Sequence, residues 1–287
     1  MPELPEVETV RRTLEPARDG VIRAVWHSGK PLRLGQQVPI SNLRKLIGGR
    51  IAKLRRLGKY LLVEIVVNRE PTGAAQTCKT LLVHLGMSGR FRLHSSGEPS
   101  APHTHVVLTL DGGRELRFSD PRRFGQVDVY DGADLRGHPA LASLGPDPLV
   151  EPTQCTGDHL FALSRGRAIT CKAFILDQRV IAGVGNIYAS EALWRAGVSP
   201  HTGAGSLTRR QAAALSEAIT AVLEHALTNG GTTLRDFVAA DGSDGEHFDY
   251  LHVYGKAETP CARCKELIVR CVDQGRATYF CRRCQKA

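Results

Sequence analysis

The first residues of the chain place a potential nucleophile next to a potential acid–base group. Pro2 follows the initiator Met1, and Glu3 follows Pro2. If Met1 is removed, as a small second residue permits, Pro2 becomes a secondary amine with a reference pKa of about 7.7–8.0. Such an amine attacks an aldehyde-like carbon and forms a charged iminium, which is a strong electron sink. The alternative is purely structural, because Pro5 and the acidic residues around it also favour a helix N-terminus.

Four cysteines near the end of the chain have the spacing of a metal site. Two residues separate Cys261 from Cys264, sixteen residues follow, and Cys281 and Cys284 repeat the pair. Two thiolate pairs on tight turns supply a tetrahedral four-sulfur site, which can hold a small hairpin that lacks a core of its own. We therefore predict one structural Zn²⁺, since four thiolates leave no open coordination position. The alternative is a set of unrelated reduced cysteines, and Cys271, between the pairs, is not needed as a ligand.

Composition and charge describe a globular protein with an anionic partner. The 287 residues are 42% hydrophobic and 23% charged, and 38 Lys and Arg against 29 Asp and Glu give a net charge of +9. This excess predicts a polyanionic partner, with nucleic acid first and an acidic membrane surface second. No apolar run approaches the roughly 20 residues of a membrane span, and no secretory signal is recognisable, which predicts a cytoplasmic protein.

The elements that must position these groups divide into a strand-rich half and a helical half. Apolar residues at helical spacing from Leu4 to Leu14 predict an N-terminal helix. Short β-rich runs separated by turns then predict an antiparallel β-sandwich or barrel in a first domain over residues 1–134. The expected strands are 20–25, 49–57, 58–67, 80–85, 90–94, 105–110, 115–118 and 126–130. Residues 135–152 are rich in Gly and Pro and predict an interdomain linker.

Helical periodicity follows the linker and predicts a helical domain over residues 153–248, with a zinc finger over 249–287. Thr208 and Gln211 form a capping-box signal at the start of the longest helix. The stretch 231–247 is rich in Gly and Asp and lacks periodicity, which predicts a mobile loop. The expected helices are 157–163, 172–180, 187–196 and 208–229.

Further motifs are Gly58-Lys59-Tyr60-Leu61, His84-Leu85-Gly86-Met87, Asp120-Pro121-Arg122-Arg123-Phe124-Gly125 and Gly183-Val184-Gly185-Asn186-Ile187-Tyr188-Ala189-Ser190-Glu191. With Pro2-Glu3-Leu4-Pro5-Glu6-Val7-Glu8 and the four-cysteine finger, they make the chain resemble bacterial formamidopyrimidine-DNA glycosylases, base-excision enzymes that remove oxidised purines and cut the strand at the abasic site. The resemblance implies an α+β protein: an antiparallel β-sandwich with a flanking helix, then a helix–two-turn–helix domain with a zinc-finger β-hairpin. It also implies double-stranded DNA as the partner, in the cytoplasm at the nucleoid, and a monomer is the default expectation.

The resemblance assigns the chemistry to four residues. Pro2 corresponds to the nucleophile that attacks C1′ of the damaged nucleotide, and its iminium then allows β- and δ-elimination. Glu3 corresponds to the general acid–base, a role worth about 10²- to 10⁴-fold in rate in enzymes generally. Lys59 corresponds to a lysine near the lesion phosphate that assists the departing base. Arg276, in the finger, is assigned a catalytic and phosphate-binding role.

Chemistry on a base requires that its nucleotide leave the stack, at a cost of about a few kcal/mol. The resemblance implies that Met87, Arg122 and Phe124 fill the gap, as an apolar wedge, a guanidinium facing the orphaned cytosine and an inserted aromatic ring. From the residues alone, Met87 and Phe124 could instead be core side chains, although the glycines beside them favour exposed loop tips. The implied DNA-binding residues are His84, Arg122, Lys172, Asn186 and Arg276, and the implied lesion-loop contacts are Thr232 and Thr233.

Two other functions stay open at this point. An endonuclease VIII-type glycosylase shares the fold and the N-terminal proline but prefers oxidised pyrimidines. Leu4 and the set of Met87, Arg122 and Phe124 favour the purine enzyme. A zinc-dependent DNA-binding protein without activity is the second alternative, and it would bind DNA with a blocked N-terminus and cleave nothing.

Overall fold

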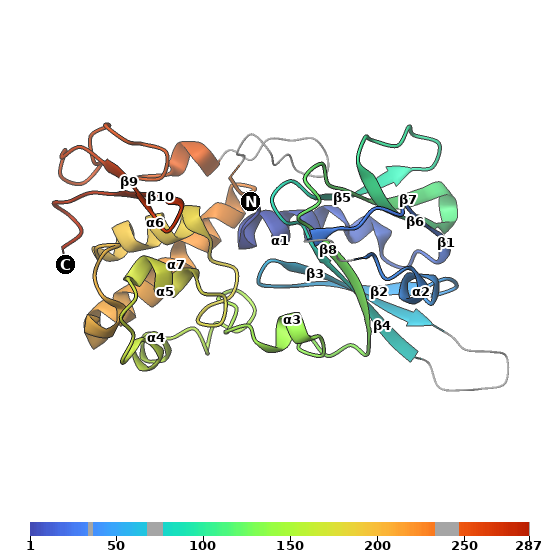
Figure 1. Ribbon diagram of the computed structural model, residues 1–287, viewed down its shortest axis with the longest axis horizontal. Helices are drawn as coiled ribbons and strands as arrows, with labels where there is room; N and C mark the ends of the chain where they lie inside the picture. Colours follow the sequence, from blue (N-terminus) through green and yellow to red (C-terminus); the bar gives the residue numbers. More distant parts are fainter. Residues whose placement is uncertain (34–36, 68–76, 233–246, 287) are drawn as a thin grey trace. The chain divides into compact units, whose positions relative to one another are not determined.

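The computed structural model describes residues 1–33, 37–67, 77–232 and 247–286, and it divides the chain into two compact units (Figure 1). One unit comprises Met1–Ala142 with Thr232–Gly245, and the other comprises Ser143–Gly231 with Glu246–Ala287. The chain passes from the first unit to the second at Ala142, within the stretch 135–152 predicted as a linker. That stretch also contains the short helix α3 (Pro139–Ala142).

Two antiparallel four-stranded sheets form the first unit, and one continuous apolar core joins them. Val63 and Leu81 of one sheet and Leu108 and Phe118 of the other belong to this core, where each is at most 1% exposed. The predicted strands are all present, and the antiparallel sandwich is confirmed. In spatial order the sheets are β1 (Ile22–His27), β6 (Thr104–Leu110), β7 (Arg114–Ser119), β5 (Arg90–Ser95), and β2 (Arg50–Leu57), β3 (Tyr60–Val67), β4 (Thr77–His84), β8 (Gln126–Asp131).

The N-terminal helix α1 (Leu4–Thr13) packs against strands of both sheets. Pro5 stands in its first turn, where a missing N–H costs no helical hydrogen bond. Val7 and Val10 belong to the sandwich core, so the helix is held by its apolar face. The described residues of this unit also form the short helical segments η1 (Glu15–Ala17), α2 (Ile40–Arg44) and η3 (Asp111–Gly113), in addition to α3.

The second unit is helical and carries one β-hairpin. Thr208 and Gln211 form the predicted capping box of its longest helix, with each backbone N–H donating to the other side chain at 3.0 and 3.2 Å. No helix in the described ranges is long and apolar enough to cross a membrane. The elements are α4 (Gly157–Ser164), α5 (Cys171–Leu176), α6 (Asn186–Ala196), η4 (Ala204–Ser206), α7 (Arg209–Thr228), η5 (His247–Tyr250), β9 (Val269–Asp273) and β10 (Arg276–Phe280).

The helix predicted over 172–180 is shorter than expected, because α5 ends at Leu176. The backbone of Asp177 is extended, and its Oδ1 accepts the N–H of Arg179 at 3.0 Å. The side chain of Gln178 donates to the carbonyl of Val184 at 2.8 Å. These local side-chain bonds replace the helical ones and turn the chain towards α6.

Candidate active site

The N-terminal pair lies at the start of α1, where a second carboxylate holds its backbone. Pro2 is buried, and Glu3 is 3% exposed. The Glu3 N–H donates to Oε2 of Glu6 at 2.8 Å. The other oxygen of Glu6, Oε1, accepts the N–H of Thr232, also at 2.8 Å. Thr232 is buried as well, whereas Thr233 lies outside the described residues.

Lys59 lies on the two-residue turn that joins β2 to β3, and it is 6% exposed. Gly58, before it, has a φ of +55°, a conformation that suits glycine. The buried guanidinium of Arg56 donates to the Gly58 carbonyl at 3.1 Å and to Glu8 Oε2 at 3.2 Å. Arg56 therefore ties the turn that carries Lys59 to helix α1.

Glu8 is the acidic end of this link. Burial raises the pKa of its carboxyl group, but hydrogen bonds and charges from Arg11 and Arg56 outweigh burial, so the net pKa lies below the ordinary value. Glu8 is thus held as a carboxylate. It also forms an ion pair with Arg12 at 3.2 Å.

His84 ends β4 and faces the ring of Tyr60, with the ring centroids 4.8 Å apart. Burial, with the nearby charges of Arg33 and Lys59, lowers the pKa of His84 to about 3. The imidazole is therefore neutral at physiological pH. Because its Nδ1 accepts the Gly86 N–H at 3.1 Å, its proton lies on Nε2, which is a donor suited to a phosphate oxygen.

The buried carboxylate of Asp120 connects the two loops that carry the predicted wedge residues. Its Oδ1 accepts the hydroxyl of Ser88 at 2.6 Å and the N–H of Arg122 at 3.2 Å. Its Oδ2 accepts the N–H of Gly125 at 2.7 Å. One carboxylate thus fixes both the loop after β4 and the loop before β8.

These two loops touch at Gly86. A Cβ there would lie 2.5 Å from the carbonyl carbon of Phe124, and the φ of Gly86 is +64°, so only glycine allows this approach. Phe124 is 43% exposed, and the guanidinium carbon of Arg122 lies 4.8 Å from its ring centroid. Met87 is half-buried on the neighbouring loop. The structure therefore brings the three wedge residues to adjoining loops, where Phe124 is not a core side chain.

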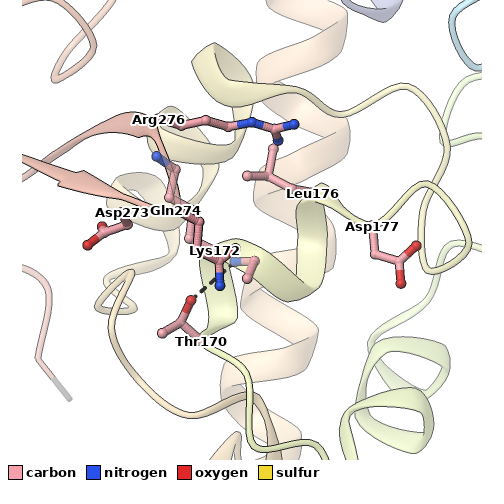
Figure 2. Close-up of a pocket in the computed structure, with 8 residues that line it drawn as sticks. Thr170, Lys172, Leu176, Asp177, Asp273, Gln274 and Arg276 are labelled. Carbon is pink, nitrogen blue, oxygen red and sulfur yellow. Dashed lines mark hydrogen bonds between the residues drawn. The ribbon is translucent and has the colours of Figure 1, made fainter.

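In the second unit, Lys172 and Asn186, both predicted to bind DNA, hydrogen-bond to the β-hairpin that carries Arg276, a third predicted DNA-binding residue. The carbonyl of Ala277 on β10 accepts the Lys172 ammonium at 2.8 Å and the Asn186 amide at 2.9 Å. Lys172 is 3% exposed and also donates to Thr278 Oγ1 at 2.7 Å. Arg276 is exposed and, with Lys172, lines a pocket of about 250 Å³ (Figure 2). Lys172 and Asn186 thus position Arg276 beside α5 and α6.

Glu191 is a further functional carboxylate of this unit, to which the sequence alone assigns no role. Glu191 of α6 is 4% exposed, and its oxygens accept the backbone N–H groups of His252, Val253 and Tyr254 at 2.8–2.9 Å. Its only signal in the sequence is an acidic residue within an otherwise apolar helical run. It anchors the segment that leads into the finger.

The four paired cysteines converge as their spacing predicts. The Sγ atoms of Cys261 and Cys284 lie 3.9 Å apart, those of Cys264 and Cys281 lie 3.4 Å apart, and all four lie within 4.8 Å of one another. With Zn–S bonds of about 2.3 Å, a tetrahedral site places sulfurs about 3.8 Å apart. The cluster therefore fits one metal ion. The indole N–H of Trp194 donates to Cys261 Sγ at 3.4 Å, as an outer-sphere hydrogen bond to a metal ligand does.

Comparison with known proteins agrees with this arrangement. Residues 1–127 match the formamidopyrimidine-DNA glycosylase N-terminal domain, and residues 144–238 match the formamidopyrimidine-DNA glycosylase H2TH domain. A curated relative from Syntrophotalea carbinolica, named formamidopyrimidine-DNA glycosylase, is 46% identical over 288 residues, which cover 100% of both chains.

Solved structures of proteins from the same family are also similar to this chain. The MutM (Fpg) protein from Thermus thermophilus has a TM-score of 0.83 at 40% identity, over 99% of this chain and 98% of that one. A Lactococcus lactis Fpg mutant bound to DNA containing Fapy-dG has a TM-score of 0.87, and the wild-type protein bound to DNA containing an oxidised pyrimidine has 0.86. Both are 30% identical and cover 100% of both chains. The chain belongs to the formamidopyrimidine-DNA glycosylase family.

Proposed function

We propose that this protein is a bifunctional DNA glycosylase and AP lyase that excises oxidised purines, 8-oxoguanine and formamidopyrimidines, from duplex DNA. The observation that carries the proposal is the buried pair of Pro2 and Glu3, whose backbone is held by the carboxylate of Glu6. That pair would supply a nucleophile and a proton donor at one place. Removal of Met1 is required, because it converts the Pro2 amide nitrogen into an amine.

The Pro2 nitrogen forms a bond to C1′ while the glycosidic bond breaks, and the base leaves with its bonding electrons. The Pro2 nitrogen loses its proton, which balances the proton that the base takes up. Glu3 donates a proton to the sugar ring oxygen, the C1′–oxygen bond breaks, and an iminium forms. Loss of a C2′ proton then expels the 3′ phosphate, a second elimination expels the 5′ phosphate, and hydrolysis of the remaining iminium by water releases the sugar fragment and regenerates the Pro2 amine. Lys59, on its buried turn, is proposed to lie near the lesion phosphate and to assist the departing base.

DNA binding is proposed to use both units. Met87, Arg122 and Phe124 would fill the gap left by the flipped nucleotide. If about five phosphates are neutralised, the logarithm of the affinity falls with the logarithm of salt concentration with a slope of about −4 to −5. We propose phosphate contacts for His84, Asn186 and Arg276, whereas Lys172, predicted as a DNA-binding residue, is buried and would act by holding the hairpin that carries Arg276. Backbone contacts with the lesion are proposed for Thr232 and Thr233.

The metal in the four-cysteine cluster is proposed to be one structural Zn²⁺. The donor set supports this choice, because four thiolates in a tetrahedron suit zinc and leave no position for substrate. We further propose that the protein acts as a monomer. Since chromosomal DNA would be its substrate, its place of action would be the nucleoid.

Borohydride trapping on an 8-oxoguanine:C duplex, followed by mass mapping, tests the mechanism. An adduct on Pro2 is expected. An adduct on Lys59 would keep the lyase but exclude Pro2 as the nucleophile, and no adduct on either purine or pyrimidine lesions would favour the binding-protein alternative. Glu3→Gln should retain DNA binding and lose excision, whereas Glu15→Gln, at a surface ion pair, should retain both.

A preference for oxidised pyrimidines is the second candidate. The observation in its favour is that a structural relative was crystallised on DNA containing an oxidised pyrimidine. Comparing kcat/KM on 8-oxoguanine:C and thymine glycol duplexes separates the two functions. A higher value for thymine glycol would reverse the assignment of lesion class and leave the nucleophile unchanged.

A further inference from the structure

Three potential metal ligands from separate parts of the second unit meet beside the hairpin. Cys271 and Asp273 are two residues apart on β9, so their side chains leave the same face of the strand. His201 comes from the turn between α6 and η4. Its Nε2 lies 3.1 Å from Asp273 Oδ2 and 3.7 Å from Cys271 Sγ, and the sulfur lies 3.5 Å from the same carboxylate oxygen.

These distances match the edges of a metal coordination tetrahedron. With bonds of about 2.05 Å to nitrogen, 2.0 Å to oxygen and 2.3 Å to sulfur, tetrahedral angles place N and O about 3.3 Å apart, N and S about 3.55 Å apart, and O and S about 3.5 Å apart. Each observed separation agrees within about 0.2 Å, the tolerance expected of a real site. The match is at least as good as that of the four-cysteine cluster, whose sulfur separations of 3.9 and 3.4 Å bracket the ideal value.

The packing around the three side chains holds them in place. The ring of His201 meets the edge of Phe280, with the ring centroids 5.1 Å apart. Thr278, which lies opposite Cys271 in the hairpin, accepts the Lys172 ammonium at 2.7 Å, so the strand that faces Cys271 is anchored to α5. The donors are therefore partly preorganised rather than mobile surface groups.

Charge and exposure also suit a cation. A thiolate and a carboxylate would contribute two negative charges, which exceed the single positive charge of Lys172, whose ammonium donates to Ala277 and Thr278 on the other strand of the hairpin. The side chains of His201 and Asp273 are 42% and 35% exposed, so an ion can enter from solvent. Figure 2 shows the Asp273 carboxylate turned away from the guanidinium of Arg276, although both residues line the same pocket.

We propose that His201, Cys271 and Asp273 form a second metal site, for Zn²⁺ or another borderline divalent cation, with its fourth position open to water. Imidazole, thiolate and carboxylate together favour this class over Mg²⁺ or Ca²⁺, which prefer oxygen donors. The site is distinct from the four-cysteine cluster and does not depend on the proposed glycosylase activity. A bound ion cross-links β9 to the segment after α6 and so stabilises the hairpin that carries Arg276.

Titration of the full-length, zinc-loaded protein with Co²⁺ tests the site. One further equivalent of Co²⁺ should bind, with a thiolate-to-metal charge-transfer band from a single sulfur, while the zinc content of the finger stays constant. Cys271→Ser and His201→Gln should each weaken this binding by at least about tenfold. Cys78→Ser, which changes a half-buried cysteine on β4, is the matched control and should bind Co²⁺ like the wild type.

Three outcomes would overturn the proposal. The first is that no second equivalent binds, in which case the cluster is only a hydrogen-bonded ion pair. The second is that Cys271→Ser binds Co²⁺ as tightly as the wild type while retaining its finger zinc. The third is that Co²⁺ uptake is matched by zinc release, which would place the new ion in the four-cysteine cluster. Because His201 lies outside the hairpin, His201→Gln keeps the test valid if Cys271→Ser fails to fold.

Discussion

Oε1 of Glu6 accepts the backbone N–H of Thr232 at 2.8 Å, although 226 positions separate the two residues in the sequence. The second oxygen of the same carboxylate holds the N–H of Glu3. Glu6 is 2% exposed, so both hydrogen bonds form away from water. One buried carboxyl group therefore positions both Glu3, beside the proposed nucleophile, and Thr232, the first of the two predicted lesion-loop contacts.

Glu6→Gln should impair catalysis more than binding. The amide keeps one acceptor but presents an NH₂ group to the other backbone N–H, and the loss of a charge-assisted hydrogen bond costs about 1.5–3 kcal/mol. We expect the single-turnover excision rate to fall by at least about tenfold. Affinity for undamaged duplex should stay within about twofold, a change of only about 0.4 kcal/mol. Glu15→Gln is the matched control, and an unchanged excision rate in Glu6→Gln would refute a positioning role.

Asp120→Asn should weaken the link between the loop after β4, which carries Met87, and the loop before β8, which carries Arg122 and Phe124. The new NH₂ group would face the N–H of Gly125 or the hydroxyl of Ser88, both of which now donate to the carboxylate. A buried donor left without an acceptor costs about 1–3 kcal/mol. We therefore expect weaker binding to lesion-containing duplex and slower nucleotide flipping, measured by 2-aminopurine fluorescence next to the lesion.

The matched control for this variant is Asp128→Asn, on β8, where the carboxylate is 32% exposed. Borohydride trapping on a preformed abasic site should be less affected in Asp120→Asn than excision of an intact lesion, since an abasic site presents no base to extrude. Equal losses on both substrates would argue against a role in the wedge.

The link between Glu8 and Arg56 should make stability depend on pH in the acidic range. The folded-state pKa of Glu8 lies below its ordinary value of 4.5, so between the two values the unfolded chain binds more protons. The free energy of unfolding therefore rises with pH through this window. The contribution of Glu8 is present above pH 4.5 and is lost as pH falls through the folded pKa. Urea denaturation of Glu8→Gln at about pH 3–6 should show a flatter profile than the wild type.

Asp158→Asn, at an exposed ion pair with Arg209 that does not involve Glu8, Arg11 or Arg56, is the control for the loss of a surface carboxylate. In Glu8→Gln, excision should also fall, because Arg56 loses the partner that ties the turn of Lys59 to α1. A wild-type slope in Glu8→Gln would show that the ion pair does not contribute to acid sensitivity.

Removal of the finger metal should unfold the hairpin and weaken DNA binding while leaving the sandwich folded. In the described part of the finger, the apolar cluster around the cysteines is small, with Val253, Ile268 and Trp194 as its main noncysteine members. Binding of a structural metal therefore supplies folding free energy that this core does not. Elemental analysis should find one tightly held zinc, and Cys264→Ser should lose it. Retention of DNA affinity by the metal-free protein would contradict a role for the finger.

Arg276→Ala should weaken binding about equally to damaged and undamaged duplexes, because a phosphate contact carries no sequence information. The slope of log affinity against log salt should become shallower by about 1. Arg179→Ala removes an exposed arginine already paired with Asp177 and should leave the slope unchanged. A loss of affinity without a change of slope would assign Arg276 to something other than phosphate.

Much of the fold was predictable from the sequence, because the signals are local. Glycine turns and β-rich runs marked the strands of the sandwich, and the spacing of Thr208 and Gln211 marked the start of α7. The spacing of the paired cysteines predicts that they converge, since each pair lies on one tight turn. The helix over 172–180 was predicted too long, because the side chains of Asp177 and Gln178 form local hydrogen bonds that periodicity does not reveal.

Only the tertiary structure decided which distant residues meet. The sequence shows only that Glu6, Asp120 and Lys172 are ionisable residues. Their roles depend on the backbone groups that packing brings to them. These groups are the N–H of Thr232 for Glu6, the N–H of Gly125 for Asp120 and the carbonyl of Ala277 for Lys172. The same holds for His201, which joins Cys271 and Asp273 only when the segment after α6 packs beside the hairpin. The sequence by itself determined the elements and the residues capable of chemistry, because periodicity and spacing act over a few residues. Burial and long-range contacts, which depend on the whole chain, determined what each of those residues holds in place.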